Sequence, residues 1–162
     1  MANRVLLVVI VSFSVPMACG GGGGDSPLSV RGTWETYVRV DCAKGHECRA
    51  SYPGAPADFE YDYGATLADC LSELQSTDFE DTVRAYEDAV THGRTVYDAA
   101  SARTCFDAWG ALGCAAYWQG DESSPACDGI FVGHVVTGGA CTLGDECVSG
   151  ACFGPAGATT CT

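Results

Sequence analysis

The chain has 162 residues, with 8 Lys and Arg against 21 Asp and Glu, and a formal net charge of −13 at pH 7. Because contacts to phosphate need Lys and Arg, this balance argues against a nucleic-acid-binding protein, and we expect no nucleic-acid partner. The 11 cysteines exceed ordinary usage and are typical of secreted, disulfide-linked proteins rather than cytosolic enzymes. The longest apolar run lies at the N-terminus and is too short for a membrane-spanning helix.

The N-terminus has the pattern of a signal peptide over residues 1–18. One positive charge precedes a run over residues 5–15 that is apolar except for two serines. Ala18, directly before Cys19, resembles the lipobox of bacterial lipoproteins, although Pro16 stands where that pattern usually has Leu. The resemblance implies that Cys19 is the lipid-attachment residue and the first residue of the mature chain. The alternative is ordinary secretion, with Cys19 left to pair with another cysteine.

The residues after Cys19 predict a flexible, lipid-anchored tether over residues 19–30. Residues 20–24 are all glycine, which gives the chain high conformational entropy and little to bury. Ten cysteines remain once Cys19 carries lipid, and ten can pair evenly. Several acyl chains anchor a protein stably, at roughly 0.8 kcal/mol per buried methylene. By the same resemblance, Gly20 in place of Asp favours the outer membrane or cell surface.

Residues 31–118 predict a helical domain, in which two capping boxes mark helix starts. The first is Thr66–Asp69, with a carboxylate three residues after the threonine. The second is Thr77–Glu80, and Gly93 marks the stop of its helix. Both starts are followed by apolar residues at helical spacing. These stripes are Leu67, Cys70, Leu71 and Leu74 in the first helix, and Phe79, Val83, Tyr86 and Val90 in the second.

Asp98 predicts the N-cap of a third helix that runs to Trp109 and ends at two glycines, with Cys105, Trp109 and Leu112 on its inner face. Residues 33–42 fit a helical stripe and a strand equally well, and we favour the helix.

Residues 119–162 predict an irregular, cysteine-rich C-terminal module with short strands. Residues 130–136 are β-branched and flanked by glycine, which indicates a short strand or hairpin. A segment so short and so rich in Gly and Cys cannot build a core of its own, so cross-links must hold it. The expected fold class is therefore mostly α: a small disulfide-stapled helical bundle with this module at its C-terminus.

All ten cysteines after Cys19 are expected to be oxidised as five disulfides, although ten cysteines allow many pairings. We expect a local loop near residue 45, a clip between two helices, a link from the helices to the module, and two bridges within the module. The corresponding pairs are Cys42–Cys48, Cys70–Cys105, Cys114–Cys127, Cys141–Cys152 and Cys147–Cys161.

Two patterns invite a metal or ligand site. His46 lies between Cys42 and Cys48, but no second short cysteine spacing completes a zinc motif, so we expect structural disulfides and no metal there. Residues 58–63 alternate acid and aromatic, and an extended chain would point three carboxylates one way and three rings the other. The carboxylates could bind calcium and the rings could stack on a sugar; the simpler interpretation is rings packed on helices and acids in water.

No catalytic motif stands out. The chain has no Gly-x-Ser-x-Gly sequence and no phosphate-binding loop, and its glycine run lacks the Lys that such a loop requires. His92 falls at a predicted helix end, where the helix dipole favours a cation, and His134 falls in the apolar strand. We therefore expect no catalytic residue, no cofactor and no enzyme activity.

The ordered run of cysteine-containing segments resembles the cysteine-rich secreted lipoproteins of GC-rich bacteria of the myxobacterial kind, whose function is unknown. The resemblance implies the fold and location given above, but no reaction. Residues 119–162 also resemble, more weakly, the Dickkopf N-terminal type of cysteine-rich module. The matching segments are Cys19 with residues 20–24, residues 96–100 with Cys105, residues 127–133 with 139–141, and residues 146–147 with 150–152.

Two classes of function remain open at this point. The first is a lipid-anchored protein of structural or binding type, attached to the membrane through Cys19, with an unidentified protein or glycan as partner. The second is a secreted enzyme or inhibitor without a recognisable active-site motif.

The anchor is tested by metabolic labelling with a fatty-acid analogue. The wild-type chain is expected to carry the label, and Cys19→Ala is expected to lose it, because the thiol is the only acyl acceptor that the motif predicts. Equal labelling of the two proteins would contradict lipid attachment at Cys19.

Overall fold

The computed structural model describes residues 27–120, 125–155 and 158–162, so the predicted signal peptide and Cys19 lie outside the described residues. The protein is mostly helical with short strands, which confirms the predicted fold class. No helix in this part of the chain has the length and apolarity needed to cross a membrane. The helices are α1 (Val30–Glu47), α2 (Pro56–Tyr63), α3 (Leu67–Leu71), α4 (Thr77–Thr91), α5 (Ala99–Gly110), α6 (Cys114–Trp118) and α7 (Pro125–Asp128). The strands are β1 (Thr95–Tyr97), β2 (Phe131–Gly133), β3 (Cys152–Phe153) and β4 (Thr160–Cys161), and the 3₁₀ turns are η1 (Arg49–Ser51), η2 (Ser72–Gln75) and η3 (Gly144–Glu146).

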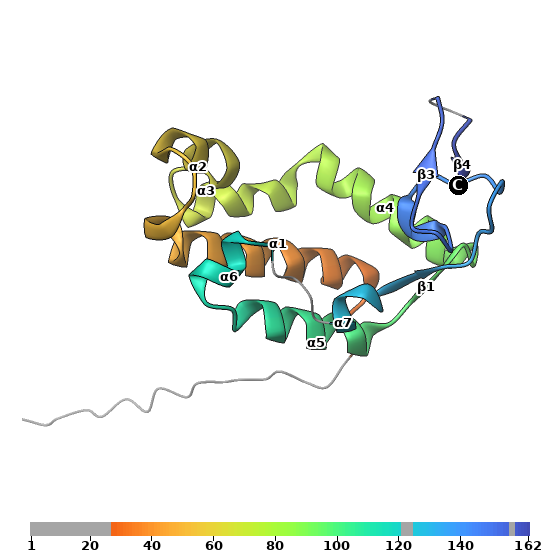
Figure 1. The fold of residues 1–162 in the computed structure, drawn as a ribbon, viewed down its shortest axis with the longest axis horizontal. Helices are drawn as coiled ribbons and strands as arrows, with labels where there is room; N and C mark the ends of the chain where they lie inside the picture. The colour runs from red at the N-terminus through yellow and green to blue at the C-terminus, as the bar shows by residue number, and fades with distance from the viewer. Residues whose placement is uncertain (1–26, 121–124, 156–157) are drawn as a thin grey trace, which may run out of the picture.

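The helix α1 is the centre of the fold, with α4 packed along one side and α5 along the other (Figure 1). Ser29 caps its start by accepting a hydrogen bond from the backbone N–H of Gly32. Residues 33–42 lie within α1, as expected. The helices α2 and α3 lie at one end of the molecule, and β3 and β4 lie at the other (Figure 1).

The predicted helix starts are confirmed, with one shift of register. Thr66 and Asp69 exchange backbone and side-chain hydrogen bonds as a capping box at the start of α3. The N-cap of α4 is Ser76 rather than Thr77, because the hydroxyl of Ser76 accepts the backbone N–H of Phe79. Asp98 caps α5 by accepting two backbone N–H groups.

The two expected apolar stripes are only partly buried. In α4, Phe79, Val83 and Tyr86 are buried, but the stripe continues through Ala89 rather than Val90. In the first stripe the expectation is wrong at Leu67, which is exposed. Leu67 is the first residue of α3, and this helix ends at Leu71, where the chain tightens into η2, so the helical spacing of the stripe is not kept to Leu74.

The predicted strand forms at β2, and its partner is β1, which lies between α4 and α5 in the chain. The two strands are antiparallel, with Val96 opposite Val132. This pairing attaches the cysteine-rich C-terminal part to the helical part. The second ribbon, β3 with β4, lies wholly within the C-terminal module.

All ten cysteines after Cys19 are paired, and the two disulfides within the module, Cys141–Cys152 and Cys147–Cys161, are those expected. The other three expected pairings are wrong. The observed pairs are Cys42–Cys70, Cys48–Cys114 and Cys105–Cys127.

The length of α1 explains why Cys42 and Cys48 do not pair with each other. Cys48 is the C-cap of α1, so the two residues are separated by about 9 Å along the helix axis, beyond the reach of a disulfide. Cys42 instead pairs with α3, and Cys48 pairs with α6. Cys105 pairs with α7, which packs directly on α5.

Removing the longest-range disulfide is expected to cost the most stability. Cys48–Cys114 spans 66 residues, and its replacement by two serines should lower the free energy of unfolding by about 4 kcal/mol, through the loop entropy that it removes from the unfolded chain. Cys141–Cys152 spans 11 residues, and its replacement should cost about 3 kcal/mol. Urea unfolding of the two double variants measures the difference, and a reversed order would contradict this account.

Candidate functional site

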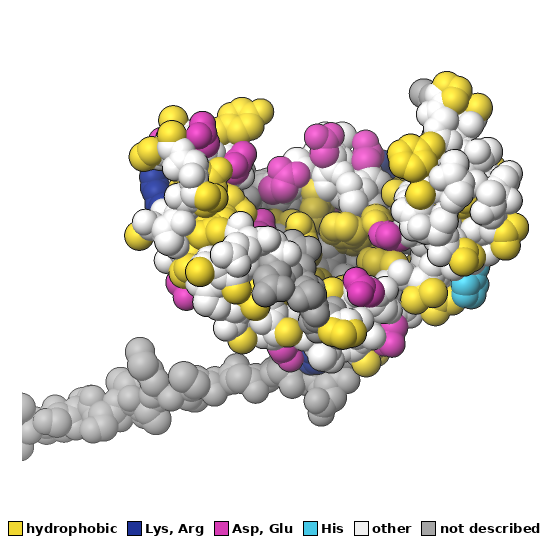
Figure 2. All heavy atoms as spheres, viewed as in Figure 1, with side chains coloured by type: hydrophobic (Ala, Val, Ile, Leu, Met, Phe, Trp, Pro, Cys, Tyr) yellow, Lys and Arg dark blue, Asp and Glu magenta, His cyan; other side chains and the backbone are white. Residues whose placement is uncertain are grey.

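One face of α1 carries residues that line three adjoining hollows, which together we call the trough. Trp34, Tyr37, Val38 and Asp41 follow one another at i, i+3, i+4 and i+7, so they share one side of the helix. Trp34 lines the central hollow and the hollow toward the module, whereas Tyr37 lines the central hollow and the one toward α2 and α3. Figure 2 shows this side of the molecule hollowed, with a hydrophobic floor and acidic side chains around it.

The central hollow is an apolar cavity of about 140 Å³ between α1 and α5. The rings of Trp34 and Trp109 each contact that of Tyr37, with centroids 5.6 and 5.1 Å apart. Tyr37 is 40% exposed, so part of its ring remains open to solvent. The lining residues are Thr33, Trp34, Tyr37, Cys105, Phe106, Trp109, Cys127 and Ile130.

The Cys105–Cys127 disulfide forms part of the wall of this cavity. It joins α5 to α7, and both of its cysteines face the central hollow. The cavity is therefore bounded by a covalent link as well as by packed rings.

The hollow toward the module has a volume of about 530 Å³ and combines aromatic rings with carboxylates. The ring of Tyr86 lies 4.8 Å from that of Trp34 and 4.5 Å from that of Phe131. The hydroxyl of Tyr86 donates a 2.5 Å hydrogen bond to Asp145. Burial, together with this hydrogen bond, raises the pKa of Tyr86, so it stays protonated and donating at neutral pH.

The hollow toward α2 and α3 has a volume of about 400 Å³ and is the most acidic of the three. At its edge, Asp41 accepts a 2.5 Å hydrogen bond from the hydroxyl of Tyr117, which lies 3.1 Å from the hydroxyl of Tyr63. Burial raises the pKa of the Asp41 carboxyl and of both tyrosines. The carboxylates that line this hollow are Asp41, Glu60, Asp62, Asp69 and Glu73.

The alternating segment at residues 58–63 is helical rather than extended, so its three carboxylates and three rings do not separate onto two faces as they would in a strand. Pro56 occupies the first helical position of α2, and the carboxylate of Asp58 accepts the backbone N–H of Ala55. Phe59 is buried and stacks on Tyr63, while Tyr61 is 91% exposed at the trough. The rings therefore divide between core and surface instead of forming one face.

The three histidines do not meet in one site. His46 contacts the backbone carbonyl oxygen of Tyr63 through Nε2. His92 is the C-cap of α4 and pairs with Asp88, as its place at a helix end suggested. His134 follows β2 and is exposed, not buried in an apolar strand.

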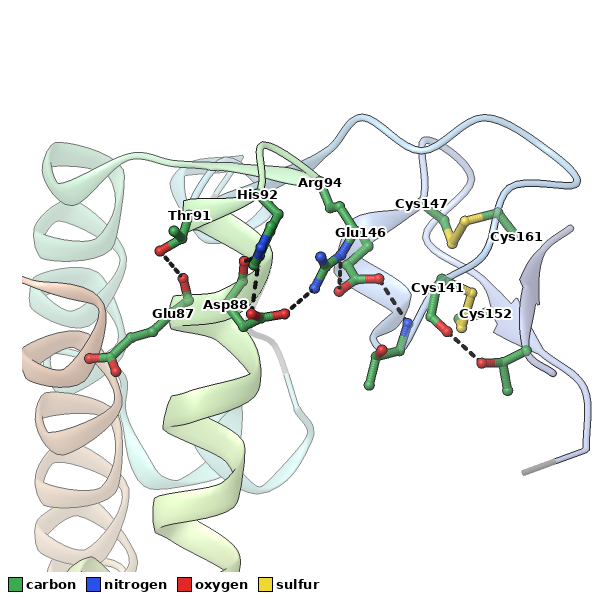
Figure 3. A network of polar contacts seen from close by, with 12 residues as sticks. Glu87, Asp88, Thr91, His92, Arg94, Cys141, Glu146, Cys147, Cys152 and Cys161 are labelled. Carbon is green, nitrogen blue, oxygen red and sulfur yellow. Dashed lines mark hydrogen bonds and ion pairs between the residues drawn. A yellow bond between two sulfur atoms is a disulfide. The ribbon is translucent and has the colours of Figure 1, made fainter. Parts of the chain in front are cut away.

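A second candidate is the polar network around Arg94, which joins α4 to the module (Figure 3). Glu146 is 0% exposed; it accepts a 2.9 Å hydrogen bond from Nε of Arg94 and one of 2.8 Å from the backbone N–H of Thr142. Arg94 also bonds Asp88, which lowers the pKa of that carboxyl. Arg94 thus connects Asp88 on α4 to the buried Glu146 in the module, so the network fixes the module against α4.

Among the described residues, two groups of potential metal ligands lie close together, and both contain disulfide cysteines. They are Cys141, Cys147 and Cys152, and Glu47, Cys48 and Cys114. A sulfur in a disulfide has no thiolate to offer a metal, so neither group is a metal centre in the oxidised protein.

Comparison of the chain with protein-family models, curated proteins and solved structures finds no match. The trough is therefore described from the structure of this chain alone. The sequence favoured a helix over residues 33–42, which include Trp34 and Tyr37, and placed Trp109 on the inner face of another helix, but nothing in the sequence indicated that the two helices meet around a cavity. The spacing of three residues between Trp34 and Tyr37 was the one feature of the sequence that could have indicated an aromatic face on α1.

The Arg94–Glu146 pair is expected to be worth far more than an exposed pair. Arg94→Gln leaves the buried carboxylate of Glu146 without its guanidinium partner, and we expect a loss of about 3 kcal/mol in the free energy of unfolding. The control is Arg84→Gln, which removes an exposed pair with Asp81 and should cost less than about 0.5 kcal/mol. Equal losses in urea unfolding would contradict the structural role of the network.

Proposed function

We propose that this protein is a lipid-anchored binding protein of the cell envelope, which captures a partner in the trough and performs no chemistry on it. The acyl chains sit on Cys19, the glycine run extends the folded part away from the membrane, and the trough faces the surroundings. The resemblance to cysteine-rich lipoproteins supports the anchor and the location. The five disulfides are those of a protein from an oxidising, extracellular-type environment.

The observation that carries the proposal is the apolar cavity in the middle of the trough. Most apolar surface of a small domain is used for its core, yet Trp34, Tyr37 and Trp109 line a hollow that opens on the surface. A concave apolar site with a few polar groups around it is the usual form of a binding site. A few residues, among which Trp, Tyr and Arg are enriched, also carry most of the binding energy in protein interfaces.

Binding rather than catalysis is favoured by the placement of the reactive side chains. His92 and His134 line none of the three hollows, and His92 is engaged by Asp88 at the end of α4. The hydroxyl of Tyr117 donates its hydrogen bond to the carboxylate of Asp41, and the pKa values of Asp41 and Tyr117 are both raised. Such a pair holds α6 on α1 and offers no nucleophile with an adjacent base.

The proposed site is tested by a fragment screen with ¹⁵N-labelled residues 20–162, a span that contains every described residue. We expect small aromatic and aliphatic fragments to shift the indole N–H signals of Trp34 and Trp109. Tyr37→Ala should weaken these fragments at least tenfold, because it removes the ring shared by two hollows. Tyr37 is 40% exposed, so its truncation should leave the fold intact by circular dichroism.

The matched control is Phe153→Ala, which truncates an exposed ring on β3, outside the trough. Fragment binding should be unchanged in this variant. Hits that map to another surface, or equal weakening in the two variants, would contradict binding in the trough.

A further inference from the structure

We propose that the trough takes an extended basic segment of a partner protein, with one apolar side chain in the central cavity and Lys or Arg side chains in the two flanking hollows. This proposal rests on the proposed function, because it names the partner of the same site. It follows from the charge, the order and the openness of the three hollows.

The charge of the trough is of one sign. The described residues that line its three hollows include seven carboxylates and no Lys, Arg or His. Among the described residues, Glu60 is the only one of the seven with an ion-pair partner, which is Arg49. Asp62 and Asp145 accept hydrogen bonds from tyrosine hydroxyls, which orient the carboxylates without neutralising them. With a net charge of −13 on the whole chain, this surface attracts cations and repels nucleic acids and anionic glycans.

The order of the hollows is acidic, apolar, acidic. Five carboxylates line the hollow toward α2 and α3, none lines the central cavity, and Asp128 and Asp145 line the hollow toward the module. A ligand that matches this order has positive charge on both sides of an apolar group. A single point cation or a wholly apolar ligand would leave part of the trough unmatched.

The length of the trough suits a short stretch of extended chain. Trp34 and Asp41 are seven residues apart on α1, which corresponds to about 10 Å along the helix axis. An extended polypeptide advances about 3.3 Å per residue, so the span accommodates three or four residues. Alternate side chains of such a segment would reach the floor and the rim in turn.

The aromatic rings provide contact surface for cationic side chains. Tyr61 is 91% exposed beside Glu60 and Asp62, and Trp34 and Phe131 flank the hollow that contains Asp145. A guanidinium or ammonium group placed over such a ring, with a carboxylate near by, gains from both the ring and the charge. The aliphatic stem of Lys or Arg covers the remaining apolar surface.

Openness distinguishes a peptide from a small amine. Pockets for small ligands usually enclose most of the ligand, whereas the trough is a run of three adjoining hollows on one face of the molecule, with the smallest in the middle (Figure 2). An extended segment can follow this surface through several contacts and place one side chain in the cavity of about 140 Å³.

The test is calorimetric titration of oxidised residues 20–162 with synthetic peptides at two salt concentrations. The probe Gly-Lys-Arg-Leu-Arg-Lys-Gly is expected to bind saturably, to weaken at higher salt, and to shift the indole signal of Trp34. Replacing its Leu by Gly should weaken binding at least fivefold, and an acidic analogue should not bind. Spermidine should bind at least tenfold more weakly than the probe.

Variants of the protein locate the contact. Tyr37→Ala and the double variant Asp128→Asn, Asp145→Asn are each expected to weaken the probe at least tenfold. The asparagine at position 145 can still accept the hydroxyl of Tyr86, so the fold should persist. The matched controls are Phe153→Ala and Asp107→Asn, an exposed ring and an exposed acid that line none of the three hollows, and both should bind like the wild type.

Equal binding of the Leu and Gly peptides, or equal binding of spermidine, would overturn the proposal. So would a failure of the probe to bind while fragments still shift Trp34, and in that case the proposed function would stand without this partner. If neither the fragments nor the probe reach the trough, both proposals fail.

Discussion

Two disulfides hold α1 in relation to the rest of the helical part, a third joins α5 to α7, and the trough depends on this covalent frame. Cys42–Cys70 joins the middle of α1 to α3, and Cys48–Cys114 joins its C-terminal end to α6. Cys105–Cys127 joins α5 to α7 in the wall of the central cavity. Six of the sixteen buried apolar residues among those described are themselves cysteines, so the cross-links occupy much of the core. A domain of this size buries too little apolar surface to be stable through packing alone. Disulfides lower the conformational entropy of the unfolded chain and so supply the missing stability.

This frame has a consequence for the surface. Because α4 and α5 each pack against α1, the aromatic face of α1 lies between them, where Trp34 and Tyr37 line the central cavity. The module at one end and the α2–α3 segment at the other bring carboxylates to both ends of that face. The buried Arg94–Glu146 pair keeps the module in the position at which Asp145 lines the trough.

The sequence predicted the features that depend on residues close together in the chain, which are the helix caps and the disulfides within the module. The capping residues Thr66 and Asp98 act through hydrogen bonds three residues away or fewer, and the short spacings within the module leave few geometrically possible pairings. The sequence did not predict features that depend on a long-range contact, or on one local pattern that overrides another. Cys42 and Cys48 are near in sequence, but a helix that runs through both keeps them apart. At residues 58–63, the strand-like alternation gave way to Pro56 and the Asp58 cap, which start a helix. The trough is lined by α1 together with elements that are distant from it in the sequence, and periodicity within one helix cannot show this.

Disulfide mapping of the secreted, oxidised protein tests this account most directly, because the placement of α1 follows from the connectivity. Proteolysis without reduction, followed by mass spectrometry, should yield peptides that link Cys42 to Cys70, Cys48 to Cys114 and Cys105 to Cys127. A peptide that links Cys42 to Cys48, or Cys70 to Cys105, would contradict the fold and remove the basis for the trough.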